Sequence, residues 1–345
     1  MRLSVLDLVP VRTGQSSSDA LAATVRLAEI ADGLGFTRYW IAEHHNIPSV
    51  AATSPAVLIA VLAAQTSRLR VGSGGVMLPN HAPLAVAEQF AMLEAAYPGR
   101  IDLGIGRAPG ADPVVAAVLR GSAGRADRAV DDFPDHLDDV LGLLGAAGVS
   151  VQLADHRYVL RSTPRAVTAP QVFLLGSSLD SARLAAAKGL PYVFGHHLFG
   201  TGTGEALALY RSDFAPGGFA AAPAAFLTVN IVVAETRDEA AALMLPSLHV
   251  LARMVTGQPP APLELVEDAE RVVLTAEQQR IVQDGLKHAV LGTPAEAAAQ
   301  LRELADRFEV DELMLNPVAS ARRGADRATT PGREATLELL AEALS

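Results

Sequence analysis

Short apolar segments alternate with longer amphipathic segments along the chain. The apolar segments predict eight strands, at residues 3–9, 39–42, 69–77, 101–105, 172–175, 192–194, 226–233 and 312–315. These strands are apolar on both faces, which is typical of parallel strands that are covered by helices. Eight strands with helices between them favour an α/β fold of the (β/α)8 (TIM) barrel type, and we expect one domain over residues 1–345.

Capping residues predict where several of the intervening helices begin. Ser18 or Asp19 precedes a helix that extends to residues 33–35. Thr-Pro pairs at 293–294 and 330–331 open the last two helices, since proline is favourable in the first turn of a helix.

Two insertions interrupt the regular alternation. Residues 149–169, before the fifth strand, contain a hairpin-like sequence, and residues 256–278, after the seventh strand, are proline-rich and then charged. Loops of this length in a compact domain are either functional or tolerated decoration. Because residues 256–278 lack a regular apolar period, we expect them to form a lid over the strand ends that is poorly ordered without ligands.

Composition excludes several classes of function. The chain has 28 basic and 38 acidic residues, and a net charge of −10 argues against a nucleic-acid partner. It has no cysteine, which excludes disulfides, thiolate metal sites and cysteine nucleophiles. No apolar run reaches the ~20 residues that a membrane span needs. We therefore expect a cytoplasmic protein without a membrane partner.

Histidines follow two of the predicted strands, at the barrel end where active sites are built. His44 and His45 come after the second strand, and His196 and His197 come after the sixth. Imidazoles at these positions suit acid–base chemistry or substrate contact, although a structural and a surface histidine would also account for each pair. The histidines show no metal-ligand spacing, so we expect no metal.

Glycines and an arginine mark two further strand ends. Gly72, Gly74 and Gly75 lie within the third strand, where glycine indicates a bulge, the close approach of a flat ligand or packing under a helix. Arg107 lies on a glycine-rich turn after the fourth strand. Its guanidinium suits a phosphate or carboxylate, and a local ion pair is the alternative.

The fifth strand is followed directly by a helix start. Gly176, Ser177 and Ser178 lie at this junction. Free N–H groups, two hydroxyls and the helix dipole together form an anion site. Ordinary N-capping by serine would explain the same residues without a ligand.

Taken together, these segments resemble the luciferase-like monooxygenases, which are FMN-linked (β/α)8 barrels. The resemblance covers nearly the whole chain. It is closest to a subgroup that includes tailoring enzymes of aromatic polyketide pathways, of the mensacarcin type. The segments that carry it are YWIAEHHN, RLRVGSGGVMLPNHAP, GRIDLGIGRAPGADP, RAVDDFPDHLDDVL, LLGSSLDSARLAAAKGLPYVFGHH, LGTPAEAAAQLREL and VDELMLNP.

The resemblance implies roles for individual residues. His44 matches the active-site histidine of the family, and His45 and His196 are candidates for the substrate pocket. Gly74 and Gly75 match a non-proline cis peptide in a bulge against the isoalloxazine. The phosphate contacts of the family correspond to Arg107, Ser177 and Ser178, and Gly176 at the same helix start is a further cofactor-binding candidate. Gly106 stands where luciferase itself has a reactive cysteine.

The resemblance also implies an activity. Reduced FMN, supplied by a separate flavin reductase, reacts with O2 to form a C4a-peroxyflavin that oxygenates a small organic substrate, for which an aromatic polyketide is one candidate. An oxidoreductase that transfers hydride with the deazaflavin F420, and a non-catalytic flavin-binding subunit, are the alternatives. Testing which reduced cofactor binds would separate the FMN-dependent function from the F420-dependent one.

The resemblance also implies pairing of two barrels. The helix at residues 57–66 is apolar nearly all round, whereas the outer face of a barrel helix is normally polar, and the helix at residues 85–97 is rich in Ala, Leu and Met. Leftover apolar surface usually marks an interface. We expect a homodimer through these two helices, the second and third.

Overall fold

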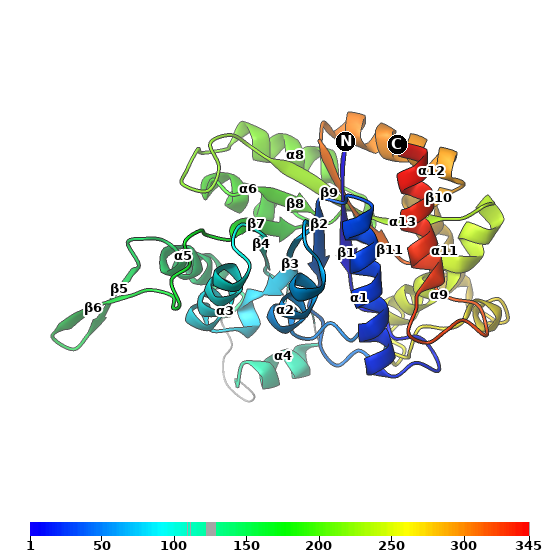
Figure 1. The fold of residues 1–345 in the computed structure, drawn as a ribbon, viewed down its shortest axis with the longest axis horizontal. Helices are drawn as coiled ribbons and strands as arrows, with labels where there is room; N and C mark the ends of the chain where they lie inside the picture. The colour runs from blue at the N-terminus through cyan, green and yellow to red at the C-terminus, as the bar shows by residue number, and fades with distance from the viewer. Residues whose placement is uncertain (109, 111, 122–128, 345) are drawn as a thin grey trace.

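Eight parallel strands form a closed barrel in the computed structural model, which describes residues 1–108, 110, 112–121 and 129–344 (Figure 1). Each predicted strand is present. The barrel strands are β1 (Arg2–Asp7), β2 (Arg38–Ile41), β3 (Arg70–Met77), β4 (Ile101–Gly106), β7 (Gln171–Gly176), β8 (Tyr192–Phe194), β9 (Ala225–Val233) and β11 (Glu312–Pro317). The predicted barrel is therefore confirmed.

One parallel strand was not predicted. β10 (Val290–Gly292) pairs with Ile231–Val233, the second half of β9. The short strand β8 pairs only with the first half of β9, at Ala225–Leu227, and so leaves the later edge of β9 open. β10 satisfies those backbone groups outside the eight-strand ring.

Helices cover the outside of the barrel (Figure 1). They are α1 (Ser17–Gly33), α2 (Pro55–Gln65), α3 (Pro83–Ala96), α4 (Pro113–Leu119), α5 (Phe133–Leu144), α6 (Leu179–Ala187), α7 (His196–Phe199), α8 (Thr203–Ser212), α9 (Arg237–Val255), α10 (Val266–Ala269), α11 (Ala276–His288), α12 (Pro294–Phe308) and α13 (Pro331–Leu344), with a 3-10 turn at Leu78–Asn80. No helix in the described part of the chain is long and apolar enough to cross a membrane.

The start of α1 corrects one sequence prediction. The N-cap is Ser16 rather than Ser18 or Asp19. The Ser16 hydroxyl accepts a hydrogen bond from the Asp19 N–H, and the Asp19 carboxylate accepts one from the Ser16 N–H at 2.8 Å. This reciprocal capping box places Asp19 in the first turn, where it stabilises the helix instead of preceding it. The predicted starts at Thr293–Pro294 and Pro331 are confirmed.

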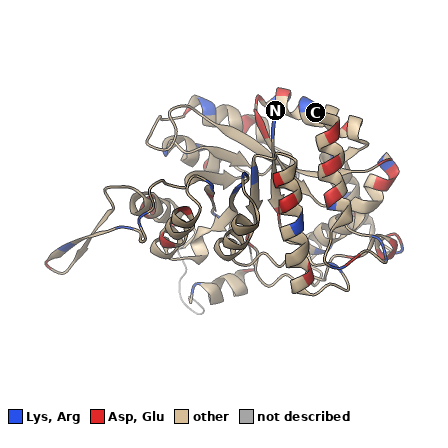
Figure 2. Ribbon diagram, viewed as in Figure 1, with Lys and Arg blue, Asp and Glu red and all other residues tan. Residues whose placement is uncertain are grey.

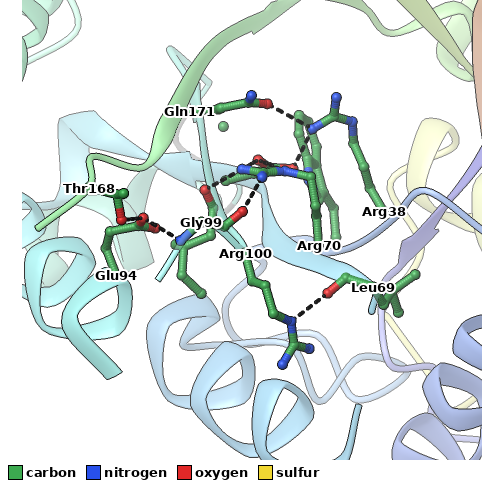
Figure 3. A network of polar contacts seen from close by, with 12 residues as sticks. Arg38, Leu69, Arg70, Glu94, Gly99, Arg100, Thr168 and Gln171 are labelled. Atoms are coloured by element: carbon green, nitrogen blue, oxygen red, sulfur yellow. Dashed lines mark hydrogen bonds and ion pairs between the residues drawn. The ribbon is translucent and has the colours of Figure 1, made fainter. Parts of the chain in front are cut away.

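The barrel interior is filled from its amino-terminal end, which restricts where a ligand can bind. Large apolar side chains, including Leu6, Trp40, Phe173, Phe226 and Met314, pack together in its middle. Below them lies a polar network around Arg38, Arg70 and Gln171 (Figure 3). The interior is therefore open to a ligand only above this packed layer, at the carboxyl ends of the strands.

Both predicted insertions have defined structure. The first contains an antiparallel hairpin of β5 (Val149–Leu153) and β6 (His156–Leu160), which protrudes from the barrel (Figure 1). The second contains α10, and Leu263 bonds with the backbone of Val11 and Thr13, just after β1. The 256–278 segment therefore lies at the carboxyl ends of the strands, beside β1.

Candidate active site

His44 lies at the open end of the barrel. Arg38 and Trp40 of β2 and Ala42, directly after it, face the interior, and His44 follows two residues later at the carboxyl end of the strand. Its side chain is partly buried, and its Nδ1 atom is buried without a hydrogen-bond partner among the described residues. Burial lowers the pKa of His44, and the charge of Glu43 offsets only part of that effect. His44 is thus a neutral imidazole with free hydrogen-bonding capacity.

His45 makes a different set of contacts. Its Nε2 atom lies 2.9 Å from Oε1 of Glu43, and Nε2 of His81 lies 2.7 Å from the same oxygen. The other carboxylate oxygen of Glu43 accepts a hydrogen bond from the Met77 N–H at 3.0 Å. His45 is therefore held in a network that joins the loop after β2 to the end of β3.

Glu43 and His81 are residues that the sequence-based reasoning did not select. Glu43 is fully buried, and burial alone would raise its pKa. Hydrogen bonds from His81, His45 and the Met77 N–H instead hold the pKa of Glu43 below its usual value. The Glu-His-His run contained a signal for this role, because a carboxylate beside imidazoles is a ready hydrogen-bond acceptor.

The third strand contains an irregularity at its glycines. The peptide bond between Gly74 and Gly75 is cis, and the pairing of β3 with β4 shifts register between Ser73 and Val76. A Cβ atom at Gly75 would lie 2.8 Å from the Gly104 carbonyl oxygen, and one at Gly74 would lie 2.5 Å from a methyl carbon of Leu6. Close packing within the barrel therefore requires glycine at both positions.

Gly106 differs from these packed glycines. If residue 106 carried a Cβ atom, the nearest described atom outside the neighbouring residues would be the Val76 carbonyl oxygen, 4.0 Å away. The packing of the protein does not require glycine at this position. The end of β4 therefore leaves room beside its backbone.

A cleft of about 540 Å3 lies between the start of α5, the strand β7 and α6, beside the end of β4. Arg107 lines it, together with Asp180, Ser181 and Arg183 from the first turns of α6. Ligand pockets are typically ~300–1,000 Å3, so the cleft has the size of a ligand site. Arg183, which the sequence-based reasoning did not select, forms a 3.2 Å ion pair with Asp180.

The serines at the start of α6 have separate roles. Ser178 is the N-cap: its hydroxyl accepts a hydrogen bond from the Ser181 N–H, and its own N–H donates to the Ser181 hydroxyl. A Cβ atom at Gly176 would lie 2.2 Å from the Ser181 hydroxyl oxygen, so glycine is needed there for the cap. Ser177 is exposed, and its hydroxyl has no partner among the described residues.

The histidine pair after β8 divides between two layers of the fold. His196 lies in the outer layer, where its Nδ1 atom is 2.8 Å from the Thr203 hydroxyl and its ring packs edge-on against Phe308 of α12. Its neighbour His197 instead bonds through Nδ1 to Thr228, an interior position of β9. The structure thus places His196 away from the barrel mouth and His197 within it.

Polar side chains continue the wall on the His197 side. Asn230 donates a hydrogen bond to the His197 carbonyl at 3.2 Å, and Asn316 of β11 donates to Asn230 at 2.8 Å. The mouth therefore has a glycine-rich side on β3 and β4 and a hydrogen-bonding side on β9 and β11. Among the described residues, no group of three or more His, Asp or Glu side chains could hold a metal.

Comparisons with known proteins agree with this geometry. The family model for luciferase-like monooxygenases matches residues 1–309. A luciferase-like monooxygenase of Escherichia coli is 38% identical over 317 residues, covering 91% of this chain and 90% of the relative. An N-acetyl-S-alkylcysteine monooxygenase of Bacillus subtilis is 33% identical over 331 residues, covering 93% and 94%.

Solved structures extend this likeness to three dimensions. The crystal structure of apo-MsnO8 has a TM-score of 0.85 and 33% identity, covering 99% of this chain and 98% of that one. Barrels in complex with FMN or with F420 also match, at 18% and 15% identity, which shows the fold alone. From the family match and these relatives, the chain belongs to the luciferase-like monooxygenase family.

Proposed function

We propose that this protein is an FMN-dependent monooxygenase that receives reduced FMN from a separate flavin reductase and uses O2 to oxygenate a small organic substrate. We include in the proposal a single domain over residues 1–345, a homodimer and a cytoplasmic location. The observation that carries the proposal is the cleft that joins Arg107 to the start of α6, beside the open backbone at Gly106.

The phosphate of FMN would bind at the α6 end of the cleft. Arg107 supplies a charged fork of donors, and the first N–H groups of α6 are unpaired within the helix. The free hydroxyl of Ser177 adds a further donor. Ser178 caps the helix, and Gly176 leaves room for that cap. A site with one such anion-binding end fits the single phosphate of FMN better than the diphosphate of FAD.

The ring system of the flavin would lie along the ends of β3 and β4. Gly74 and Gly75 present backbone rather than side chains at the bulge, and Gly106 leaves space beside β4. A flat ring needs such an approach to main-chain atoms. The reduced flavin, when bound, supplies the activation of O2.

His44 would contact the flavin or the substrate from the β2 side of the mouth. Because it is partly buried and neutral, it can donate or accept a hydrogen bond without adding a charge to the site. We propose that it orients the reacting groups and helps keep water out. His45 supports the loop of His44 through Glu43, and His196 supports α7 from outside.

The substrate is proposed by class only. One relative is named N-acetyl-S-alkylcysteine monooxygenase, which indicates a small organic substrate for that protein. The sequence resemblance to tailoring enzymes of aromatic polyketide pathways keeps an aromatic polyketide as a candidate. An F420-dependent oxidoreductase and a non-catalytic flavin-binding subunit are the competing functions, and the monooxygenase relatives favour neither.

Cofactor titration followed by turnover tests the proposal. FMN should bind more tightly than FAD or F420, and photoreduced FMN with O2 and a panel of thioethers and hydroxyarenes should yield a product that contains one atom from 18O2. Tighter binding of F420 would favour the hydride-transfer alternative. Binding of FMN without any oxygenated product would favour the flavin-binding subunit.

The variant His44→Ala tests the role of that residue. It should keep the fold and the FMN affinity but release more hydrogen peroxide per reduced flavin, because the reacting groups are less well oriented. His196→Ala is the matched control, since His196 lies outside the mouth. Unchanged coupling of flavin oxidation to product in His44→Ala would make His44 a structural residue.

A further inference from the structure

His197 and His44 both follow barrel strands at their carboxyl ends. The two residues follow β8 and β2, which are four strands apart in the ring of eight and therefore lie on opposite sides. A ligand in the mouth would thus lie between two imidazoles.

The partner of His197 determines which of its nitrogen atoms carries the proton. The hydroxyl of Thr228 donates to the Phe194 carbonyl, at 3.4 Å, and a carbonyl oxygen can only accept. A Thr228 hydroxyl that donates to this carbonyl can only accept a hydrogen bond from Nδ1 of His197. This arrangement favours the tautomer with the proton on Nδ1, and Nε2 then presents a lone pair.

That lone pair has no partner within the protein. Nε2 of His197 forms no hydrogen bond with any described residue, although the ring is only partly exposed. The backbone of His197 is fixed as well, because its carbonyl accepts a hydrogen bond from Asn230, which Asn316 holds in turn. The acceptor is therefore rigidly placed, which is what specific recognition needs.

We propose that His197 is a substrate-binding residue whose Nε2 accepts a hydrogen bond from a hydroxyl group of the substrate. This inference deepens the proposed function and rests on it: the substrate class becomes hydroxyl-bearing organic molecules, held between His197 and the glycine side of the mouth. Thr228 is the positioning residue, because it fixes the proton of His197 on Nδ1. His44 remains the residue on the β2 side.

Nitrogen NMR of histidine-labelled protein tests the tautomer without any turnover. The His197 signal, assigned by its loss in His197→Asn, should show a neutral ring protonated on Nδ1 at pH 7. Thr228→Ser keeps the hydroxyl and should keep this state, whereas Thr228→Val should give a mixture of tautomers. A ring protonated on Nε2 in the wild-type protein would overturn the proposal, since the mouth would then face a donor.

Phenol and its methyl ether, anisole, test the recognition in the same spectra. Phenol should shift the Nε2 signal of His197, and anisole, which has no hydroxyl proton, should not. His197→Asn should bind phenol roughly 3- to 10-fold more weakly, as expected for the loss of one hydrogen bond. His196→Asn should bind it like the wild type. An Nε2 signal that does not respond to phenol, or an equal response to anisole, would overturn the proposal.

These measurements separate the inference from the proposed function. The tautomer and the phenol response are read in protein without flavin, and then again after FMN is added. If FMN does not bind while His197 still selects phenol over anisole, the FMN function fails and the hydroxyl site stands. If FMN binds and oxygenation occurs but His197 shows no selectivity, the inference alone fails.

Discussion

The guanidinium of Arg38 lies 2.7 Å from a carboxylate oxygen of Asp102, and both side chains are buried at the amino-terminal end of the barrel. Asp102 also accepts hydrogen bonds from the Trp40 indole at 2.9 Å and from Arg70 at 2.6 Å. Figure 3 shows Arg38 and Arg70 in this network. The Asp102 carboxylate thus forms ion pairs with both arginines and holds the Trp40 indole below the active-site end of the barrel.

Replacing Asp102 should destabilise the fold strongly. Asp102→Asn leaves two arginines partly uncompensated, and removing one partner of a buried ion pair costs about 3–5 kcal/mol. The free energy of unfolding in urea, followed by the fluorescence of Trp40, measures the effect. Asp284→Asn is the control, because its ion pair with Lys287 is exposed and should contribute under about 1 kcal/mol. Equal stability of the two variants would contradict the prediction.

Arg107→Ala should weaken FMN binding by about 1.5–3 kcal/mol and leave riboflavin binding nearly unchanged. Riboflavin lacks the phosphate, so the comparison isolates the contact at the cleft. Isothermal titration of both ligands measures the difference. Arg237→Ala, which removes an exposed arginine with a 3.7 Å ion pair to Glu296, is the control. Equal losses for both ligands in Arg107→Ala would show that Arg107 does not contact the phosphate.

The outer faces of α2 and α3 should form a homodimer interface. Figure 2 shows no charged residue on α2, and Val57 and Met92 are 63% and 61% exposed. A stable interface buries on the order of 2,000 Å2, and a charge at its centre should prevent association. Val57→Glu and Met92→Glu should therefore be folded monomers in light scattering. Val273→Glu, at a 95% exposed position outside both helices, should remain a dimer. A monomeric wild-type protein would refute the interface.

The 256–278 segment should be protected from proteolysis by ligands. Glu264 bonds to His249 at 2.7 Å and Ser320 donates to the Glu264 carbonyl at 2.7 Å, so one end of the exposed stretch 257–262 is anchored. We expect cleavage within this stretch to be fast in the free protein and slower with FMN and substrate, because a lid closes over the bound ligands. A cleavage rate that ligands leave unchanged would argue against a lid.

Stability should fall on the acid side of neutrality partly because of His197. Burial, and then the charges of His44 and His196, lower its pKa to about 4. In the unfolded chain His197 therefore binds a proton near pH 6.5, whereas in the folded protein it does so only near pH 4. The contribution of His197 to stability is fully present above pH 6.5 and is lost as the pH falls through this window, by about 3 kcal/mol at most.

The variant His197→Asn tests this pH dependence. It cannot take up that proton, so its stability should fall less steeply between pH 6.5 and 4 than that of the wild type. Urea unfolding at several pH values gives the two slopes. If the slopes are equal, His197 does not titrate differently in the folded and unfolded states.

Several features of this protein were determined by the sequence alone. Continuous apolar runs such as 226–233 predicted the strands, because parallel strands covered by helices are apolar on both faces. Thr293 and Pro294 predicted a helix start from local hydrogen bonding and proline geometry. The short strand β10 escaped prediction, because three residues are too few for a pattern and an open edge of β9 decides their pairing.

Only the tertiary structure decided which histidines reach the mouth. A strand that is apolar on both faces carries no pattern that tells the barrel interior from the helix side, so neighbours such as His196 and His197 look equivalent in the sequence. Closure of the barrel sets the direction of each strand position: Phe226 faces inward, and Thr228, two residues later on β9, faces the same way. His197 then enters the mouth because Thr228, distant in sequence, lies beneath it.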